Sequence, residues 1–119
     1  MNAADYGVPQ LRERVFLLGS QNEILKFPKP THGSQSKLKK PHVSVIDAIK
    51  DIYDPNEKVK PFGGMYGHLL PLVPEGENYS FFTSDKGYKK PIFKWRTKFS
   101  NFLYKCDRNK PCRTIQAQP

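Results

Sequence analysis

The chain has no long hydrophobic run. Across 119 residues only 37% are hydrophobic, and each apolar stretch is short. A membrane-spanning helix needs roughly 20 consecutive apolar residues, so a transmembrane protein is not expected. No signal-peptide pattern opens the sequence either. We therefore expect a single small cytoplasmic domain with a broadly polar surface and no membrane partner.

Cysteine and histidine are also scarce. The chain holds two cysteines, Cys106 and Cys112, and three scattered histidines. Their spacing does not match that of a zinc site, so we predict no bound metal. Intracellular chains seldom keep disulfides, and both cysteines are therefore expected to be thiols.

Acidic residues are few, especially late in the chain. The formal net charge is +9, and Asp107 is the only acidic residue between Lys86 and Arg113. Clustered cations neutralise phosphates, although they also occur on faces that only aid solubility. We favour a DNA-binding role because the charges cluster. The candidate DNA contacts are Arg96, Lys89, Lys90, Lys94 and Lys98.

Aromatic residues interleave with these cations. A small domain needs large rings in its core, so Phe93, Phe99 and Phe102 are predicted to be buried. Tyr88 and Trp95 stay open between core packing and stacking on bases. Among the cations, Arg96 is the best candidate to read guanine, because its planar fork can bind that base through two hydrogen bonds.

The middle of the chain predicts one short helix. Ser44 is a candidate N-cap, with Asp47 three residues later. An apolar stripe follows until Asp54-Pro55 and is predicted to pack on a core; it comprises Val45, Ile46, Ile49 and Ile52. Residues 102–106 and 113–117 look like strands joined through residues 107–110 as a hairpin. The predicted fold class is a β-rich α+β domain.

The N-terminal segment predicts a strand that is preceded by residues with long polar side chains. Side chains alternate along an extended chain, so Gln10, Arg12 and Arg14 are expected on one side and Glu13 on the other. Residues 15–18 are all apolar, which is typical of a strand covered on both faces. The arginine forks suit phosphates or the keto edge of a base. The alternative is that they pair with acidic neighbours such as Glu13 or Asp5.

Residues 2–19 carry a longer pattern, Asn-Ala-x-Asp-Tyr-Gly-x-Pro-Gln-x-Arg-x-Arg followed by the apolar run. This pattern resembles the eighth sequence motif of DNA cytosine-5 methyltransferases. Looser matches follow in the order of that family. They are Pro-Thr-His at residues 30–32, the predicted short helix, Pro-x-Gly-x-Asn at 74–78 and Pro-x-x-Thr-Ile at 111–115.

The resemblance implies roles for matched residues. The family transfers a methyl group from S-adenosylmethionine to carbon 5 of a cytosine flipped out of the duplex. By position, Arg14 corresponds to the arginine that reaches the 2-keto oxygen of the cytosine. Arg12 corresponds to an arginine that braces the catalytic loop, and Gln10 to an amide that orders the same pocket.

The same resemblance implies a division of the chain. Residues 1–26 correspond to a catalytic-domain strand separated from its sheet, and residues 27–42 to a Pro- and Lys-rich crossing loop. Residues 43–119 correspond to an incomplete target-recognition domain. The expected partners are double-stranded DNA and the remainder of the methyltransferase catalytic domain, in the cytoplasm of a bacterium and near its nucleoid.

The Pro111-Cys112 dipeptide looks like the family's nucleophile but is rejected as such. Arg113 follows it where the family has Gln, and it lies after the eighth motif, whereas the nucleophile loop comes before. A structural role in or next to a strand is predicted instead. The chain also lacks the cofactor motifs, so it is expected to be inactive alone and to bind no S-adenosylmethionine. The rival hypotheses are a non-enzymatic basic nucleic-acid-binding module and a remnant that only binds other proteins.

Overall fold

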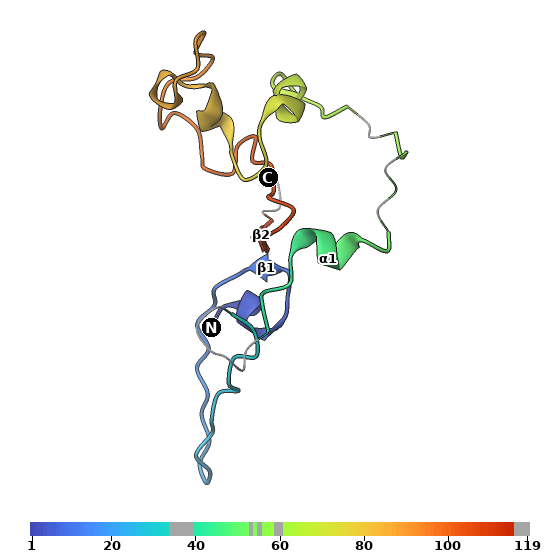
Figure 1. Ribbon diagram of the computed structural model, residues 1–119. Helices are drawn as coiled ribbons and strands as arrows, with labels where there is room; N and C mark the ends of the chain where they lie inside the picture. Colours follow the sequence, from blue (N-terminus) through green and yellow to red (C-terminus); the bar gives the residue numbers. More distant parts are fainter. Residues whose placement is uncertain (34–39, 53, 55, 59–60, 116–119) are drawn as a thin grey trace. The chain divides into compact units, whose positions relative to one another are not determined.

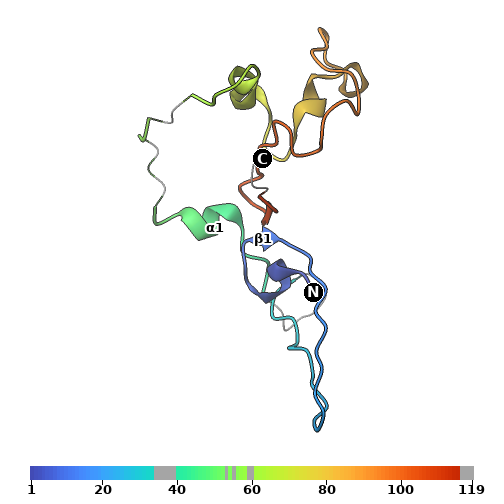
Figure 2. The ribbon, with the colours of Figure 1, turned by 180° about the vertical axis from the view of Figure 1, so that it is seen from behind.

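The computed structural model describes residues 1–33, 40–52, 54, 56–58 and 61–115. The chain divides into two compact units (Figures 1 and 2). Unit 1 comprises Met1–Asp51 and Arg108–Pro119, and unit 2 comprises Ile52–Asp107. No helix among the described residues is long and apolar enough to cross a membrane.

Unit 1 begins with a 3-10 helix, η1 (Ala3–Tyr6), followed by the short strand β1 (Gln10–Leu11). Strand β1 pairs in parallel with β2 (Cys112–Arg113), with Gln10 opposite Cys112. A bond from the backbone N–H of Cys112 to the carbonyl of Pro9, 2.9 Å, extends this pairing. The two-stranded sheet therefore joins the beginning of the chain to its end.

The helix of unit 1, α1 (Val45–Ile49), begins where the sequence predicts. The Ser44 hydroxyl accepts from the Asp47 N–H at 3.2 Å, and the Asp47 carboxylate accepts from the Ser44 N–H at 3.3 Å. This reciprocal capping box satisfies backbone donors that a helix start leaves open. The helix ends before Asp54, and Pro55 lies outside the described residues.

The apolar stripe of α1 is less buried than predicted. Val45, Ile46 and Ile49 are half-buried, and Ile52 is 80% exposed. The backbone N–H groups of Val45 and Ile46 donate to the carbonyls of Lys110 and Arg108 at 3.0 and 2.9 Å. The helix is therefore held to the C-terminal segment of unit 1 by hydrogen bonds as well as by its apolar face.

Unit 2 contains an aromatic core and three 3-10 helices, η2 (Gly67–Leu72), η3 (Tyr79–Phe82) and η4 (Ser84–Lys86). The buried residues of this core are Leu69, Val73, Tyr79, Phe82 and Phe93. Phe102 and Tyr88 pack against it half-buried. The core predictions for Phe93 and Phe102 are thus confirmed, but that for Phe99 is wrong, since its side chain is 89% exposed.

The described residues contain less β-structure than predicted. A small α+β fold is confirmed, but the hairpin is wrong. Segment 102–105 instead bonds to segment 76–79, with Tyr79 donating to Phe102 at 3.1 Å and Lys105 to Glu77 at 3.0 Å. Residues 112–113 pair with β1, a partner far away in sequence, and residues 116–117 of the predicted strand lie outside the described part.

The buried strand predicted for residues 15–18 is also wrong. The described segment 14–30 has no helix or strand and runs out and back as an extended arm (Figures 1 and 2). Val15 and Leu17 are 89% and 94% exposed. An entirely apolar strand is stable only when neighbouring strands pair with it and other elements pack on both of its faces. The described residues provide neither the strands nor the packing.

Candidate functional site

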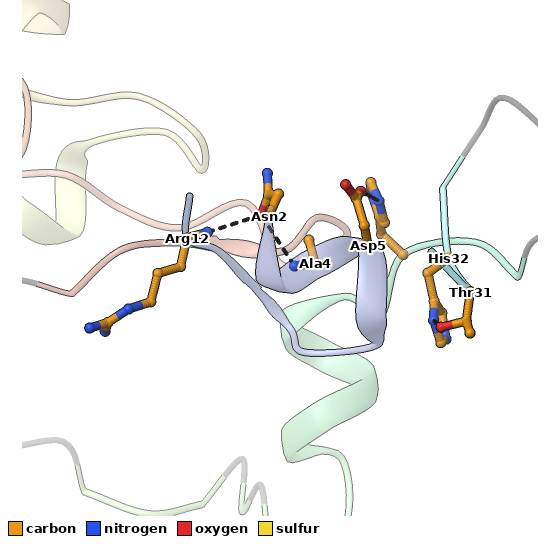
Figure 3. A network of polar contacts seen from close by, with 7 residues as sticks. Asn2, Ala4, Asp5, Arg12, Thr31 and His32 are labelled. Carbon is orange, nitrogen blue, oxygen red and sulfur yellow. Dashed lines mark hydrogen bonds and ion pairs between the residues drawn. The ribbon is translucent and has the colours of Figure 1, made fainter. Parts of the chain in front are cut away.

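The side chain of Asn2 organises the start of unit 1. Its Oδ1 atom accepts from the N–H of Ala4 at 3.2 Å and from the N–H of Arg12 at 3.1 Å, as Figure 3 shows. The first bond caps η1, and the second holds the chain just after β1. Two further bonds join the same segments: Ala3 donates to the carbonyl of Arg12 at 3.0 Å, and Arg14 to that of Met1 at 2.9 Å. The backbone that carries both arginines is therefore fixed to η1.

Gly7 ends η1 in a left-handed conformation, with φ at +87°. A Cβ atom there would lie 2.8 Å from Cε1 of His32, closer than atoms pack. Only glycine suits this position, because it lacks the side chain that both constraints exclude. The turn thus brings residue 32 directly against the motif.

Asp5 ties η1 to two later segments. Its carbonyl accepts from the N–H groups of Thr31 and His32 at 2.9 and 3.0 Å. Its carboxylate lies 3.0 Å from Nε2 of His42. The Tyr6 hydroxyl donates to the carbonyl of Pro28 at 3.0 Å. Residues 5 and 32, far apart in the sequence, are therefore in backbone contact, and the Asp5 carboxylate is engaged by a histidine rather than by an arginine.

A pocket of about 220 Å³ opens beside this network, and both motif arginines line it. Its walls are Met1, Asn2, Ala3, Tyr6, Arg12, Arg14 and Phe16. The shared wall agrees with the prediction that Arg12 and Arg14 face the same way. Gln10 is not part of the wall, because it lies in β1, where its backbone pairs with Cys112.

Neither guanidinium is neutralised within the described part of the chain. The ion pairs found there join His42 to Asp5 and Lys86 to Glu77. The Arg14 Nη1 atom donates to the backbone carbonyl of Glu13 at 2.6 Å, which leaves the Glu13 carboxylate unused by it. The alternative of arginines paired with Glu13 or Asp5 is therefore wrong. The arginines thus place two cations without a carboxylate partner beside a largely apolar pocket. Guanidinium groups of this kind suit an anionic or keto-bearing ligand.

Sequence reasoning did not assign five of the seven wall residues to the site: Met1, Asn2, Ala3, Tyr6 and Phe16. Asn2 had a readable signal, since Asn is a preferred N-cap residue and a short polar helix follows it. Tyr6 and Phe16 carried none, because their place in the wall depends on the turn at Gly7 and on the course of the arm.

The five candidate DNA contacts are all exposed in unit 2. Lys98 places its Nζ atom 5.7 Å from the centroid of the Phe102 ring. Arg96 has a left-handed backbone, with φ at 57°. None of the five forms an ion pair within the described residues. Unit 1 therefore carries the two motif arginines, and unit 2 separately carries the five exposed cations that are candidate DNA contacts.

Cys112 lies in β2 and is half-buried, as predicted for a residue in or next to a strand. Its backbone lies opposite Gln10. In the described ranges no three or more His, Cys, Asp or Glu side chains gather in a group that could hold a metal ion.

Comparison with known proteins covers almost the whole chain. The family model for C-5 cytosine-specific DNA methylases matches residues 1–116. Type II methyltransferase M.SacI of Streptomyces achromogenes is 38% identical over 125 residues, covering 98% of this chain and 32% of that protein. Type II methyltransferase M.NgoFVII of Neisseria gonorrhoeae is 30% identical over 122 residues, covering 98% and 31%.

A third relative matches a shorter part of the chain with higher sequence identity. Type II methyltransferase M.BsuRI of Bacillus subtilis is 49% identical over 55 residues, which is 44% of this chain and 12% of that protein. No solved structure matches the chain. The chain spans about a third of the length of the two relatives that match it from end to end.

Proposed function

Because the chain belongs to the C-5 cytosine-specific DNA methylase family, we propose that it supplies target-cytosine contacts and DNA recognition to a methylating enzyme. The parent reaction is the transfer of a methyl group to carbon 5 of a flipped cytosine in a specific duplex, in a restriction-modification setting. The observation that supports this proposal is the pocket that Arg12 and Arg14 line together without a carboxylate partner among the described residues.

The chemistry of the pocket suits a cytosine ring. Attack at carbon 6 of the base builds negative charge that spreads to the 2-keto oxygen. A guanidinium that is already fixed in place stabilises this charge without reorganising. In our proposal Arg14 contacts that oxygen, Arg12 braces the catalytic loop of the parent enzyme, and Gln10 helps to order the same pocket. The bond from the Arg12 backbone N–H to Asn2 fixes the position of this arginine.

The methyl donor of the family is S-adenosylmethionine, and the pocket of this chain does not fit it. The donor carries a cationic sulfonium, an ammonium and one carboxylate, so its net charge is positive, and the wall offers two arginines but no carboxylate to hold the sulfonium or the ammonium. Like charges at such a site repel. We therefore assign the pocket to the target base and none of these residues to the cofactor.

The exposed arm indicates a protein partner. Val15, Leu17 and Ile24 are 89%, 94% and 90% exposed, and removing apolar surface from water is favourable by about 25 cal/mol per Å². We propose that the remainder of the methylase catalytic domain covers the arm. Cys112, held in β2, is not the nucleophile in this proposal, and the chain alone is inactive.

The test is Arg14→Ala in the intact methylase that contains these residues. Losing one preorganised charge-stabilising donor costs about 100-fold or more in the chemical step. Single-turnover methyl transfer should therefore fall by this order, while duplex affinity changes little, because Arg14 is one of many cations. Arg14→Lys keeps the charge but loses the planar guanidinium. Its single-turnover rate should lie between those of the wild type and Arg14→Ala.

A matched control is Lys29→Ala, which removes an exposed cation from the same arm. It should leave methyl transfer near the wild-type rate. Equal losses in rate and in duplex affinity for Arg14→Ala would show that this residue merely binds phosphate, and would contradict the proposed role.

A further inference from the structure

Residues 94–101 of unit 2 form a loop that we call the basic finger. It starts after Phe93, which is buried, and returns at Phe102, which packs against the same core. The rings of these two residues lie edge to face, with centroids 5.8 Å apart. The finger therefore leaves the core and re-enters it at nearly the same place, so its residues project outward.

Hydrogen bonds hold the finger at several points. The Thr97 hydroxyl donates to the carbonyl of Lys94 at 2.7 Å, and the Phe102 N–H donates to that of Phe99 at 2.9 Å. The side chain of Asn78 donates to the carbonyl of Ser100 at 2.7 Å, and the Lys98 N–H donates to the Tyr79 hydroxyl at 3.4 Å. The conformation is thus set before a ligand binds, which lowers the entropic cost of binding.

The finger exposes two aromatic rings instead of burying them. Phe99 is 89% exposed and Trp95 is 44% exposed, although both lie close in sequence to the aromatic core. A ring in water loses the stabilisation that burial would give it. The bond from the Phe102 N–H to the Phe99 carbonyl closes a tight turn between the exposed Phe99 ring and the Phe102 ring that packs on the core.

Cations surround these rings. Lys94, Arg96 and Lys98 alternate along the finger, Lys89 and Lys90 precede it, and all five are exposed. No acidic residue lies in the finger. Positive charge interleaved with an exposed aromatic is the composition by which proteins bind nucleic acid, with cations on the phosphates and rings on the bases. A purely protein partner would need a matching acidic surface around an apolar contact.

We propose that the basic finger enters the groove of duplex DNA and that the Phe99 ring stacks on a nucleobase there. This inference rests on the proposed DNA recognition by the chain. Lysines of the finger bind the phosphates, which places the ring at the base stack, and apolar side chains that insert between base steps unstack them locally. Trp95 lies beside the contact and reports on it.

The experiment measures binding of a short mixed-sequence duplex by the chain at low salt. Trp95 is the only tryptophan, so its fluorescence follows docking at the finger without a label. Phe99→Ala should weaken duplex binding roughly 5- to 150-fold, the range for removing one base-stacking ring. Phe99→Tyr keeps the ring and should bind like the wild type.

Two controls separate stacking from charge. Phe62→Ala removes another exposed phenylalanine of unit 2, 55% exposed and outside the finger, and should bind the duplex normally. Heparin is a polyanion without bases, so Phe99→Ala should bind it as the wild type does. Urea unfolding of each variant, followed by Trp95, checks that unit 2 is intact.

The outcomes distinguish this inference from the proposal beneath it. If the wild-type chain binds duplex and Phe99→Ala binds it equally well, the stacking role is overturned and DNA recognition by the chain stands. If Phe99→Ala weakens duplex and heparin binding alike, the ring has no base contact and the inference is also overturned. If the wild-type chain does not bind duplex at low salt, both proposals fail.

Discussion

At the residue scale, the motif is held by single atoms that serve two segments at once. Oδ1 of Asn2 accepts from the N–H groups of both Ala4 and Arg12, so one carboxamide fixes a helix start and the strand exit. The carbonyl of Asp5 likewise accepts from Thr31 and His32. The pocket is therefore shaped by hydrogen bonds that fix the backbone around it.

Gly7 offers the sharpest test of this arrangement. Gly7→Ala places a methyl group 2.8 Å from Cε1 of His32 at a φ of +87°, so strain and crowding add. We expect a loss of roughly 2 to 4 kcal/mol in the free energy of unfolding of unit 1. Urea unfolding, followed by amide NMR signals of residues 2–14, measures it.

The matched control is Gly64→Ala in unit 2. Its φ of +83° is nearly the same, but nothing lies within 4 Å of an added Cβ. Only the backbone strain remains, about 1 to 2 kcal/mol. If both variants lost the same stability in their own units, close approach to His32 would contribute nothing.

The structure could be predicted where it depends on residues close in sequence. It could not be predicted where it depends on how distant segments pack. Ser44 and Asp47 were correctly assigned to a helix start because a capping box is set by residues three apart. The burial of Phe93 and the exposure of Phe99 depend on how a whole loop folds over the core. Hydrophobicity alone does not separate these two side chains.

At the scale of elements, α1 is a helix of a single turn that depends on its cap. Isolated helices this short are not stable by themselves, because nucleation costs more than the few hydrogen bonds return. Hydrogen bonds from the Ser44 hydroxyl and backbone, together with Lys50, hold the pKa of the Asp47 carboxyl below its ordinary value of 3.8. The carboxylate form is therefore the one that the helix needs.

This linkage predicts a loss of α1 in acid. A carboxyl whose pKa is lowered by folding stabilises the folded state fully above its ordinary value of 3.8 and loses that contribution as the pH falls through the lowered value. Amide NMR signals of α1 should therefore keep their helical shifts above this ordinary value and lose them as the pH falls through the lowered pKa. Asp47→Asn should remove this pH dependence.

The control for this titration is Asp51→Asn, which removes an exposed carboxylate just after α1 and leaves the capping box intact. It should titrate like the wild type. A wild-type helix that keeps its shifts unchanged in strong acid would show that the box does not depend on ionised Asp47.

The strands illustrate where sequence patterns fail. Residues 15–18 have the pattern of a buried strand but no cover among the described residues, and β1 consists of two residues with little pattern at all. Strand β1 exists because residues 112–113 return to it. Pairing between distant segments is invisible to any local pattern, so the hairpin was expected instead.

At the scale of the whole molecule, the dominant property is the net charge of +9. Neutralising phosphates releases counterions, so the logarithm of DNA affinity should fall linearly with the logarithm of salt concentration. We expect Lys89→Ala together with Lys90→Ala to flatten the slope by about 2. Fluorescence titrations of duplex at several salt concentrations measure this slope.

The paired control changes two exposed lysines of the arm, Lys26 and Lys29, to alanine. The net charge falls by the same amount, but no predicted phosphate contact is lost, so the slope should stay near that of the wild type. Identical slopes for the two double variants would mean that charge acts only through its total, without a localised DNA surface.

The parallel pairing of β1 with β2 also governs the order in which the protein is assembled during translation. Residues 10–11 leave the ribosome before unit 2 does, but their partners at 112–113 emerge only after every residue of unit 2 has been made. Closing so long a loop is slow compared with forming local contacts. Unit 2 should therefore fold while still attached to the ribosome, and the segment that precedes it must wait with its apolar arm open to chaperones.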